Sequence, residues 1–224
     1  MKDEQQSILE NDERLVLGTV QLGMPYGVAN KDGMPTLDTA LAIVHEAWSS
    51  GVREFDTAQG YGSSEEVLGK VFAELGIAKD VKVISKFEPT LDHLNKAVML
   101  EAIDTSLNTI GVSQLFGIML HREELLLLWD EGLKAILQSF VEAGKVKYIG
   151  VSVYTPEKAI QALNTSGIDI IQLPTNILDR RFVNAGVFKL ALEKRKIIYI
   201  RSVFLQGLIL MPLVSIPSKM VFVK

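Results

Sequence analysis

The chain has 224 residues, of which 48% are hydrophobic and 22% charged, and its formal net charge is −4 at pH 7. This length allows a large buried core, and a slightly acidic chain without a basic stripe is not expected to bind nucleic acid. Cysteine is absent, which excludes disulfides, thiolate catalysis and cysteine-based zinc sites. Residues 1–14 are polar rather than signal-like, and no apolar run approaches the roughly 18 residues that span a membrane. We therefore expect a cytoplasmic protein without a membrane partner.

Short β-branched runs alternate with amphipathic segments along the whole chain. Apolar residues at helical spacing predict helices over 36–50, 63–76, 95–110, 130–143, 155–163 and 186–195. The runs between them predict strands over 15–20, 53–57, 81–86, 115–120, 146–152, 168–173 and 197–203.

Local signals mark the ends of two of these helices. Ser63 with Glu66 forms a capping-box pattern at the start of the second helix, and Gly76 follows its end. Thr155 precedes Pro156, which is the arrangement of an N-cap and a first-turn proline.

The regular alternation predicts parallel strands joined by helical crossovers. A doubly wound sheet is the alternative, but a (β/α)8 barrel of the TIM type is favoured, because no G-x-G-x-x-G pattern follows the first strand. The segment GTVQLG (18–23) also lacks the Lys-Ser/Thr pair of a phosphate-binding P-loop. We expect one domain over 1–224, with a polar segment at 1–14 and an atypical tail at 213–224.

Ionisable residues stand at the ends of three consecutive predicted strands. Asp56 ends the second strand, Lys86 the third and His121 follows the fourth, while Tyr61 lies on the loop after Asp56. Parallel barrel strands all end on the face that carries the active site, with neighbours about 5 Å apart. These four side chains are therefore expected to meet.

Each of the four residues also has a structural interpretation. Asp56 could cap a turn, Tyr61 could pack in a loop, Lys86 could be solvated and His121 could be structural. Together they favour chemistry, because an ammonium that ends an apolar strand needs a nearby anion, and Asp56 is the nearest.

The combination suits proton transfer to a carbonyl oxygen. A phenol has a pKa near 10, and a neighbouring ammonium is expected to lower it, which would make Tyr61 a general acid for an alkoxide. A neutral His121 could donate a hydrogen bond to the same oxygen. Protonating an alkoxide implies a hydride source, hence a nicotinamide cofactor. With only three histidines, no metal site is predicted.

Here the residues resemble a known family. DTAQGYG (56–62), ISK (84–86) and LHR (120–122) resemble the aldo-keto reductase superfamily, and the resemblance runs from about residue 15 to about residue 212. The later segments GVSVYTPE, IQLPTNILDRR and IRSVFLQGLILM resemble a bacterial branch associated with sugar or surface-polysaccharide metabolism.

The resemblance implies a (β/α)8 barrel that reversibly reduces aldehydes or ketones with NADP(H) or NAD(H). It makes Tyr61 the proton donor, supported by Asp56, Lys86 and His121. Ser152 and Gln172 would hold the nicotinamide carboxamide, and Arg201 would stack on the ring where many members have an aromatic. The full set of implied cofactor contacts is Gly18, Thr19, Gln21, Asp56, Ser152, Gln172, Arg201, Ser202, Leu205 and Gly207.

Structural interpretations remain open for several of these positions. Arg201 could form an ion pair at its strand exit, and Gln172 could pair with backbone. Asn176, Arg180 and Arg181, which follow the sixth strand, could touch substrate or cofactor but suit solvated loop positions better.

Members of the family usually continue beyond the point where this chain stops, so the last strand–helix unit is expected to be missing. Strands one and seven would then have unpaired edges. The run MVFV (220–223) or a second copy of the chain could cover them, and the alternative for MVFV is a frayed terminus. A catalytically silent binding protein is the alternative function, and a sugar-phosphate lyase or isomerase is a weaker one.

Overall fold

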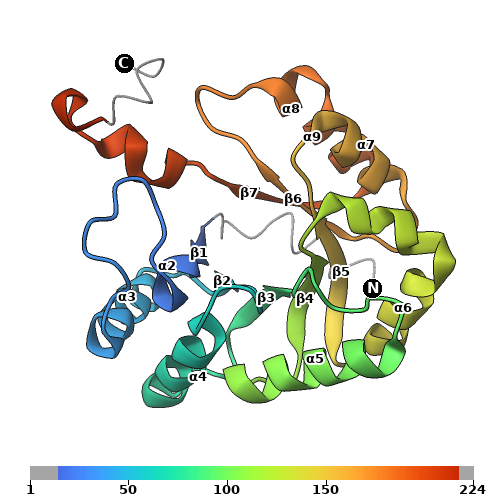
Figure 1. Ribbon diagram of the computed structural model, residues 1–224, viewed down its shortest axis with the longest axis horizontal. Helices are drawn as coiled ribbons and strands as arrows, with labels where there is room; N and C mark the ends of the chain where they lie inside the picture. Colours follow the sequence, from blue (N-terminus) through green and yellow to red (C-terminus); the bar gives the residue numbers. More distant parts are fainter. Residues whose placement is uncertain (1–14, 217–224) are drawn as a thin grey trace.

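The computed structural model describes residues 15–216 and contains a single seven-stranded parallel sheet over that range (Figure 1). The strands are β1 (Val16–Gly18), β2 (Glu54–Asp56), β3 (Lys82–Lys86), β4 (Leu115–Leu120), β5 (Val146–Ser152), β6 (Ile170–Pro174) and β7 (Ile197–Arg201). The helices are α2 (Val20–Gly23), α3 (Leu37–Ser49), α4 (Ser64–Leu75), α5 (Lys96–Ile110), α6 (Lys134–Glu142), α7 (Pro156–Asn164), α8 (Arg181–Asn184) and α9 (Val187–Lys194). Shorter helical turns are η1 (Glu123–Leu128), η2 (Trp129–Leu133), η3 (Leu205–Leu210) and η4 (Leu213–Ser215).

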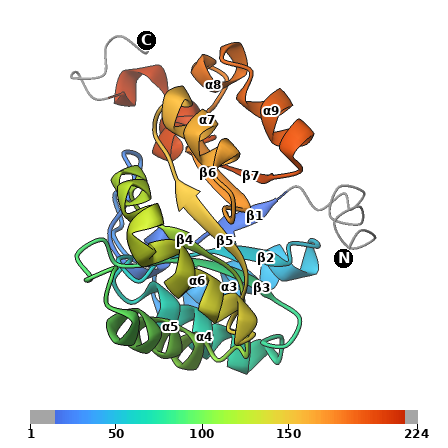
Figure 2. The ribbon, with the colours of Figure 1, turned by 90° about the vertical axis from the view of Figure 1, so that its right-hand side faces the viewer.

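The strands follow one another in sequence order, and each pairs in parallel with the next. The sheet is curled, with the helices around its outside (Figures 1 and 2). Within the described range no strand pairs with the outer edge of β1 or β7. This is the predicted (β/α)8-type barrel with one strand–helix unit fewer in residues 15–216. The doubly wound alternative is wrong, because that fold reverses its strand order partway through the sheet.

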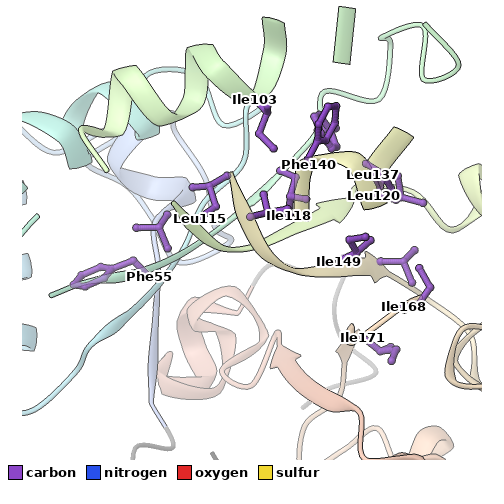
Figure 3. Close-up of a cluster of buried hydrophobic side chains, with 14 of the residues drawn as sticks. Phe55, Ile103, Leu115, Ile118, Leu120, Leu137, Phe140, Ile149, Ile168 and Ile171 are labelled. Atoms are coloured by element: carbon purple, nitrogen blue, oxygen red, sulfur yellow. The ribbon is translucent and has the colours of Figure 1, made fainter. Parts of the chain in front are cut away.

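Apolar side chains pack on both faces of the curled sheet. Between sheet and helices, a continuous cluster includes Phe55, Leu115 and Phe140, all at most 1% exposed (Figure 3). Inside the curl a smaller cluster contains Ile84, Phe116, Met119, Ile170 and Tyr199. This double burial explains why the central strands β4 and β6 are apolar nearly throughout, whereas β1 and β7 at the two edges are only partly buried.

A hydrogen bond also crosses the inside of the curl. The Tyr199 hydroxyl of β7 donates to Glu54 Oε2 of β2 at 2.5 Å. Burial is the largest cause of a raised pKa at Tyr199, and the neighbouring Glu54 carboxylate adds to it. The bond therefore links the last strand to the second one.

Several predicted elements differ by a residue or more from the observed ones, and three of these differences occur where the backbone changes direction. The first strand stops at Gly18 and the chain turns into α2, with both the amide and the hydroxyl of Thr19 donating to the Asp56 carbonyl. The helix predicted from 130 is regular only from Lys134, since Gly132 adopts a φ of 127°. The last strand ends at Arg201, after which the backbone turns with positive φ.

The helix ends test the cap predictions. Thr155 accepts a hydrogen bond from Lys158 N at 3.3 Å, and Gly76 ends α4 in the left-handed conformation, as predicted. The prediction of a capping box at Ser63 is wrong. Its side chain makes no cap bond, because the hydroxyl instead donates to the Gly23 carbonyl at 3.4 Å.

The segment after β7 returns toward the loop between α2 and α3 (Figure 1). Ala29 N donates to the Gln206 carbonyl at 3.3 Å, and Gln206 Nε2 donates to Tyr26 Oη at 3.0 Å. The run 220–223, one of the two candidates for covering the open edge, lies outside the described residues. None of the helices within residues 15–216 has the length and hydropathy to cross a bilayer.

Candidate active site

An ion pair joins the carboxyl ends of β2 and β3. Lys86 Nζ donates to Asp56 Oδ1 at 2.7 Å and to the Thr57 carbonyl at 2.8 Å. The Lys86 side chain is 1% exposed and that of Asp56 15%. A buried ammonium is tolerated only with such partners, so the anion predicted for Lys86 is indeed Asp56.

Tyr61 lies above this pair and beside His121. Lys86 Nζ is 4.8 Å from the centroid of the Tyr61 ring, and the Tyr61 and His121 ring centroids are 5.6 Å apart in an edge-on arrangement. The structure therefore brings together Asp56, Tyr61, Lys86 and His121, the four residues that were predicted to meet.

The loop that carries Tyr61 packs directly on the end of α2. A Cβ atom on Gly23 would lie 2.0 Å from the Tyr61 carbonyl oxygen, and one on Gly62 would lie 2.3 Å from the Gly23 carbonyl oxygen. Only glycine at both positions permits this approach. Ser64 N also donates to the Tyr61 carbonyl at 3.1 Å, which fixes the loop at the start of α4.

The electrostatics at Tyr61 differ from the sequence-based expectation. Burial raises the pKa of Tyr61 above its ordinary value; Lys86 acts in the opposite direction and Asp56 adds to the rise. The prediction that Lys86 would leave this phenol with a lowered pKa is therefore wrong, because desolvation of the phenolate outweighs the nearby ammonium.

His121 is a neutral imidazole at pH 7. Burial, followed by the positive charge of Lys86, lowers the pKa of His121 to about 4. Its Nδ1 atom is buried without a hydrogen-bond partner. A neutral ring carries one N–H donor, as the role predicted for His121 requires.

A cavity of about 2490 Å³ opens at these strand ends and extends along the inside of the curl between β1 and β7. Tyr61 and His121 line it, whereas Lys86 does not. Most of the expected cofactor contacts also line this cavity: Gly18, Thr19, Gln21, Asp56, Ser152, Gln172, Arg201, Ser202 and Gly207. Leu205 is not among the described residues that line it.

Gln172 connects the Asp56 side of the cavity to β6. Its Nε2 atom donates to Asp56 Oδ1 at 3.0 Å, while its Oε1 atom is buried without a partner. Gln172 therefore pairs with a side chain and not with backbone. An unsatisfied buried carbonyl oxygen needs a donor, and the amide N–H of a carboxamide such as that of nicotinamide fits this need.

Arg201 at the end of β7 stacks on an aromatic ring that sequence reasoning missed. Its guanidinium carbon lies 4.3 Å from the centroid of the Tyr154 ring, and its Nη2 atom is buried without a partner. Within residues 15–216 no carboxylate lies at ion-pair distance from Arg201, so the ion-pair interpretation is wrong. Tyr154 stands two residues beyond the end of β5, and only its position after a strand end could have drawn attention to it.

Other predicted residues bond to nearby parts of the protein. Ser64 Oγ donates to Thr19 Oγ1 at 2.8 Å, and Gln21 Nε2 donates to the Tyr26 carbonyl at 2.7 Å. Beyond β6, Arg181 pairs with Asp179 at 2.8 Å, which agrees with a solvated loop charge.

Comparison with known proteins identifies the family. The profile of the Aldo/keto reductase family matches residues 14–211, and the chain belongs to that family. It is 32% identical over 162 residues to Protein REDOX 2 of Catharanthus roseus, which covers 64% of this chain and 50% of that protein. It is 28% identical over 179 residues to the aldo-keto reductase YhdN of Bacillus subtilis, with coverage of 75% and 51%. The chain thus spans about half the length of these relatives.

Solved structures show the same fold. An aldo-keto reductase from Bacillus halodurans in its holo form matches with a TM-score of 0.73 at 25% identity, covering 91% of this chain and 66% of that one. The glycerol dehydrogenase of Gluconobacter oxydans matches with a TM-score of 0.71 at 22% identity, with coverage of 91% and 64%. An aldo/keto reductase from Klebsiella pneumoniae, solved with NADP and acetate, matches with a TM-score of 0.66 at 20% identity, with coverage of 86% and 65%.

Proposed function

We propose that this protein reduces an aldehyde or ketone to an alcohol with NADPH or NADH as hydride donor. The observation that carries the proposal is the Lys86–Asp56 pair, with Nζ and Oδ1 2.7 Å apart, buried beneath Tyr61 and next to a neutral His121. Tyr61 and His121 both line the cavity, so a carbonyl group in the cavity could contact both rings.

In this proposal Tyr61 donates the proton. The raised pKa of Tyr61 keeps the phenol protonated at neutral pH, so the proton is present when an alkoxide forms. The charge of Lys86 then stabilises the phenolate that remains. Asp56 holds Lys86 in place, and His121 donates a hydrogen bond to the carbonyl oxygen.

The nicotinamide cofactor would supply the hydride. The unpaired Gln172 Oε1 and the neighbouring strand end at Ser152 would hold its carboxamide, and Arg201 would stack on its ring. The remaining expected contacts, Gly18, Thr19, Gln21, Asp56, Ser202, Leu205 and Gly207, follow from the family resemblance. The NADP complex of the Klebsiella pneumoniae relative supports NADP(H), and NAD(H) is the second candidate.

The test combines binding and turnover. NADPH and NADH are titrated by fluorescence, and reduction is then measured on a panel of aldehydes that includes sugar-derived ones. Tyr61→Phe should lower kcat by about 10²–10⁴-fold, because a positioned proton donor contributes that much, and should leave cofactor affinity unchanged. Unchanged aldehyde reduction in Tyr61→Phe would refute the role of the phenol. Tight cofactor binding without turnover in the wild-type protein would instead support the alternative of a catalytically silent binding protein.

The remaining predictions on location and partners belong to the same proposal. A cytoplasmic location would supply the reduced cofactor, and a small carbonyl compound is the expected partner in place of nucleic acid or a membrane. Two copies are proposed to associate along the open edges of β1 and β7. Sedimentation that shows a monomer at all accessible concentrations would refute this association.

A further inference from the structure

Glu65, in the first turn of α4, is a largely buried carboxylate without a cationic partner. Its Oε1 atom accepts a hydrogen bond from the Ser85 hydroxyl at 2.6 Å, and its Oε2 atom accepts one from the Ser106 hydroxyl at 3.1 Å. Within residues 15–216 no lysine, arginine or histidine lies at ion-pair distance from it. Burial raises the pKa of Glu65, and the two hydroxyls only oppose this rise. Burying an unpaired carboxylate costs free energy, so its presence calls for an explanation.

Gln59 is the second polar side chain of this region, and it lies two residues before Tyr61. Its Nε2 atom donates to Ser106 Oγ and to the Ala102 carbonyl, both at 3.0 Å. Its Oε1 atom accepts from Glu88 N at 2.9 Å. Both amide N–H groups and the carbonyl oxygen are therefore used within the protein.

The close approach of α4 and α5 makes this network geometrically feasible. A Cβ atom on Gly69 would lie 2.1 Å from the Thr109 carbonyl oxygen, so only glycine fits there. Gly69 lies one helical turn after Glu65, and Thr109 nearly one turn after Ser106. The contact therefore brings Ser106 within reach of Glu65.

We propose that Gln59, held by Glu65 through the shared Ser106 hydroxyl, is a positioning residue that fixes Tyr61 relative to Lys86. Gln59 belongs to the loop of Tyr61, and Ser85 is the residue before Lys86 on β3. The network thus ties the loop to the strand that carries the lysine. Gln59 and Glu65 are absent from the described lining of the cavity, so they act on the reaction only through Tyr61 and Lys86. The proposal rests on the proposed reductase function.

The main variant is Gln59→Met, which keeps the length of the side chain and removes its hydrogen bonds. Its kcat should fall by about tenfold or more, because misplacing a reacting group by about 1 Å can cost about 10²-fold. The KM for the aldehyde and the Kd for the cofactor should stay within about twofold, since Gln59 does not line the cavity. The matched control is Gln114→Met. Gln114, just before β4, also donates to a backbone carbonyl, that of Gly144 just before β5, at 2.8 Å. This bond lies at the opposite ends of the strands, so the kcat of the control should not change.

Ser106→Ala tests the link between the two residues. It should also lower kcat. In the double variant with Gln59→Met, the activation free energy should rise by less than the sum of the rises in the two single variants. Its control is Ser139→Ala on α6, whose hydroxyl donates to the Ile136 carbonyl at 2.7 Å, outside the network. If Gln59→Met does not fold, Ser106→Ala decides the question by the same kcat and KM criteria.

Amide hydrogen exchange separates this proposal from the proposed function. The Tyr61 and Ser64 amides, which bond to the Ala58 and Tyr61 carbonyls, should exchange at least about tenfold faster in Gln59→Met at unchanged global stability. A wild-type protein that reduces no carbonyl would refute the function, while exchange would still test the network. Two outcomes would overturn the positioning role. In the first, Gln59→Met keeps the kcat and the exchange rates of the wild-type protein; in the second, it loses kcat and cofactor affinity to the same extent.

Discussion

The two sides of the curled sheet differ in how completely their polar groups are satisfied. At the ends of β2 and β3, Lys86 has two partners within 2.8 Å. At the ends of β6 and β7, Gln172 Oε1 and Arg201 Nη2 are buried without partners. Beyond β7, non-glycine residues at 202, 205 and 206 adopt positive φ. The Lys86–Asp56 pair is thus satisfied within the protein. The side that the proposal assigns to the cofactor retains unmet hydrogen-bonding capacity at two buried atoms, and on the proton-donor side His121 Nδ1 is likewise without a partner.

Breaking the buried pair should have the largest effect on stability. Lys86→Met leaves Asp56 without its ammonium partner, and loss of one member of a buried pair costs about 3–5 kcal/mol. We expect the free energy of unfolding to fall by about this amount, together with loss of turnover. Urea unfolding measures the first effect and an aldehyde assay the second. A loss of less than about 1 kcal/mol would show that the pair is not a major structural element.

The packing of the Tyr61 loop predicts the next largest effect. In Gly23→Ala the new Cβ atom would lie 2.0 Å from the Tyr61 carbonyl oxygen, so the loop must move, and overpacking of this kind costs about 1–3 kcal/mol. Gly18→Ala is the matched control, because no atom lies within 4 Å of its Cβ position. Thermal unfolding should separate the two variants. Equal unfolding temperatures would mean that the loop accommodates the methyl group without strain.

The neutral His121 predicts a dependence of stability on pH. Because its folded pKa of about 4 lies below the ordinary value of 6.5, the unfolded chain binds the proton more readily between these values. The stability present above pH 6.5 should therefore decline as the pH falls toward 4. His121→Gln should remove about 1–2 kcal/mol of this decline, a figure reduced for partial solvent screening. Urea midpoints at pH 7.5, 6 and 5 measure it, and parallel pH profiles for the two proteins would contradict the assignment.

A substitution at the ends of β6 and β7, the side assigned to the cofactor, should give the smallest change in the free energy of unfolding. Arg201→Met removes a guanidinium that stacks on Tyr154, an interaction worth about 0.5–1 kcal/mol at a partly exposed site. Its unfolding free energy should change by no more than this, while cofactor titration should show weaker binding. A loss of stability as large as that of Lys86→Met would abolish the contrast between the two sides.

Much of the fold was predictable because its signals are local. Strand–helix alternation placed Asp56, Lys86 and His121 at neighbouring strand ends, and parallel pairing made their convergence follow. The cap at Thr155 was equally local. The polar network of Gln59 and Glu65 was not predicted, because its members lie on β3, α4, α5 and the loops after β2 and β3, and because it depends on how closely α4 and α5 approach.

The sequence by itself determined the order of the elements and which ionisable side chains meet, since hydrophobic periodicity and strand direction need only nearby residues. Tertiary structure alone decided three features: the upward shift of the Tyr61 pKa, the hydrogen bond from the Ser63 hydroxyl to the Gly23 carbonyl, and the stacking of Arg201 on Tyr154. The physical reason is that burial and close approach sum over residues distant in the chain. Desolvation at Tyr61 therefore outweighs the lysine that the local motif brings close to it.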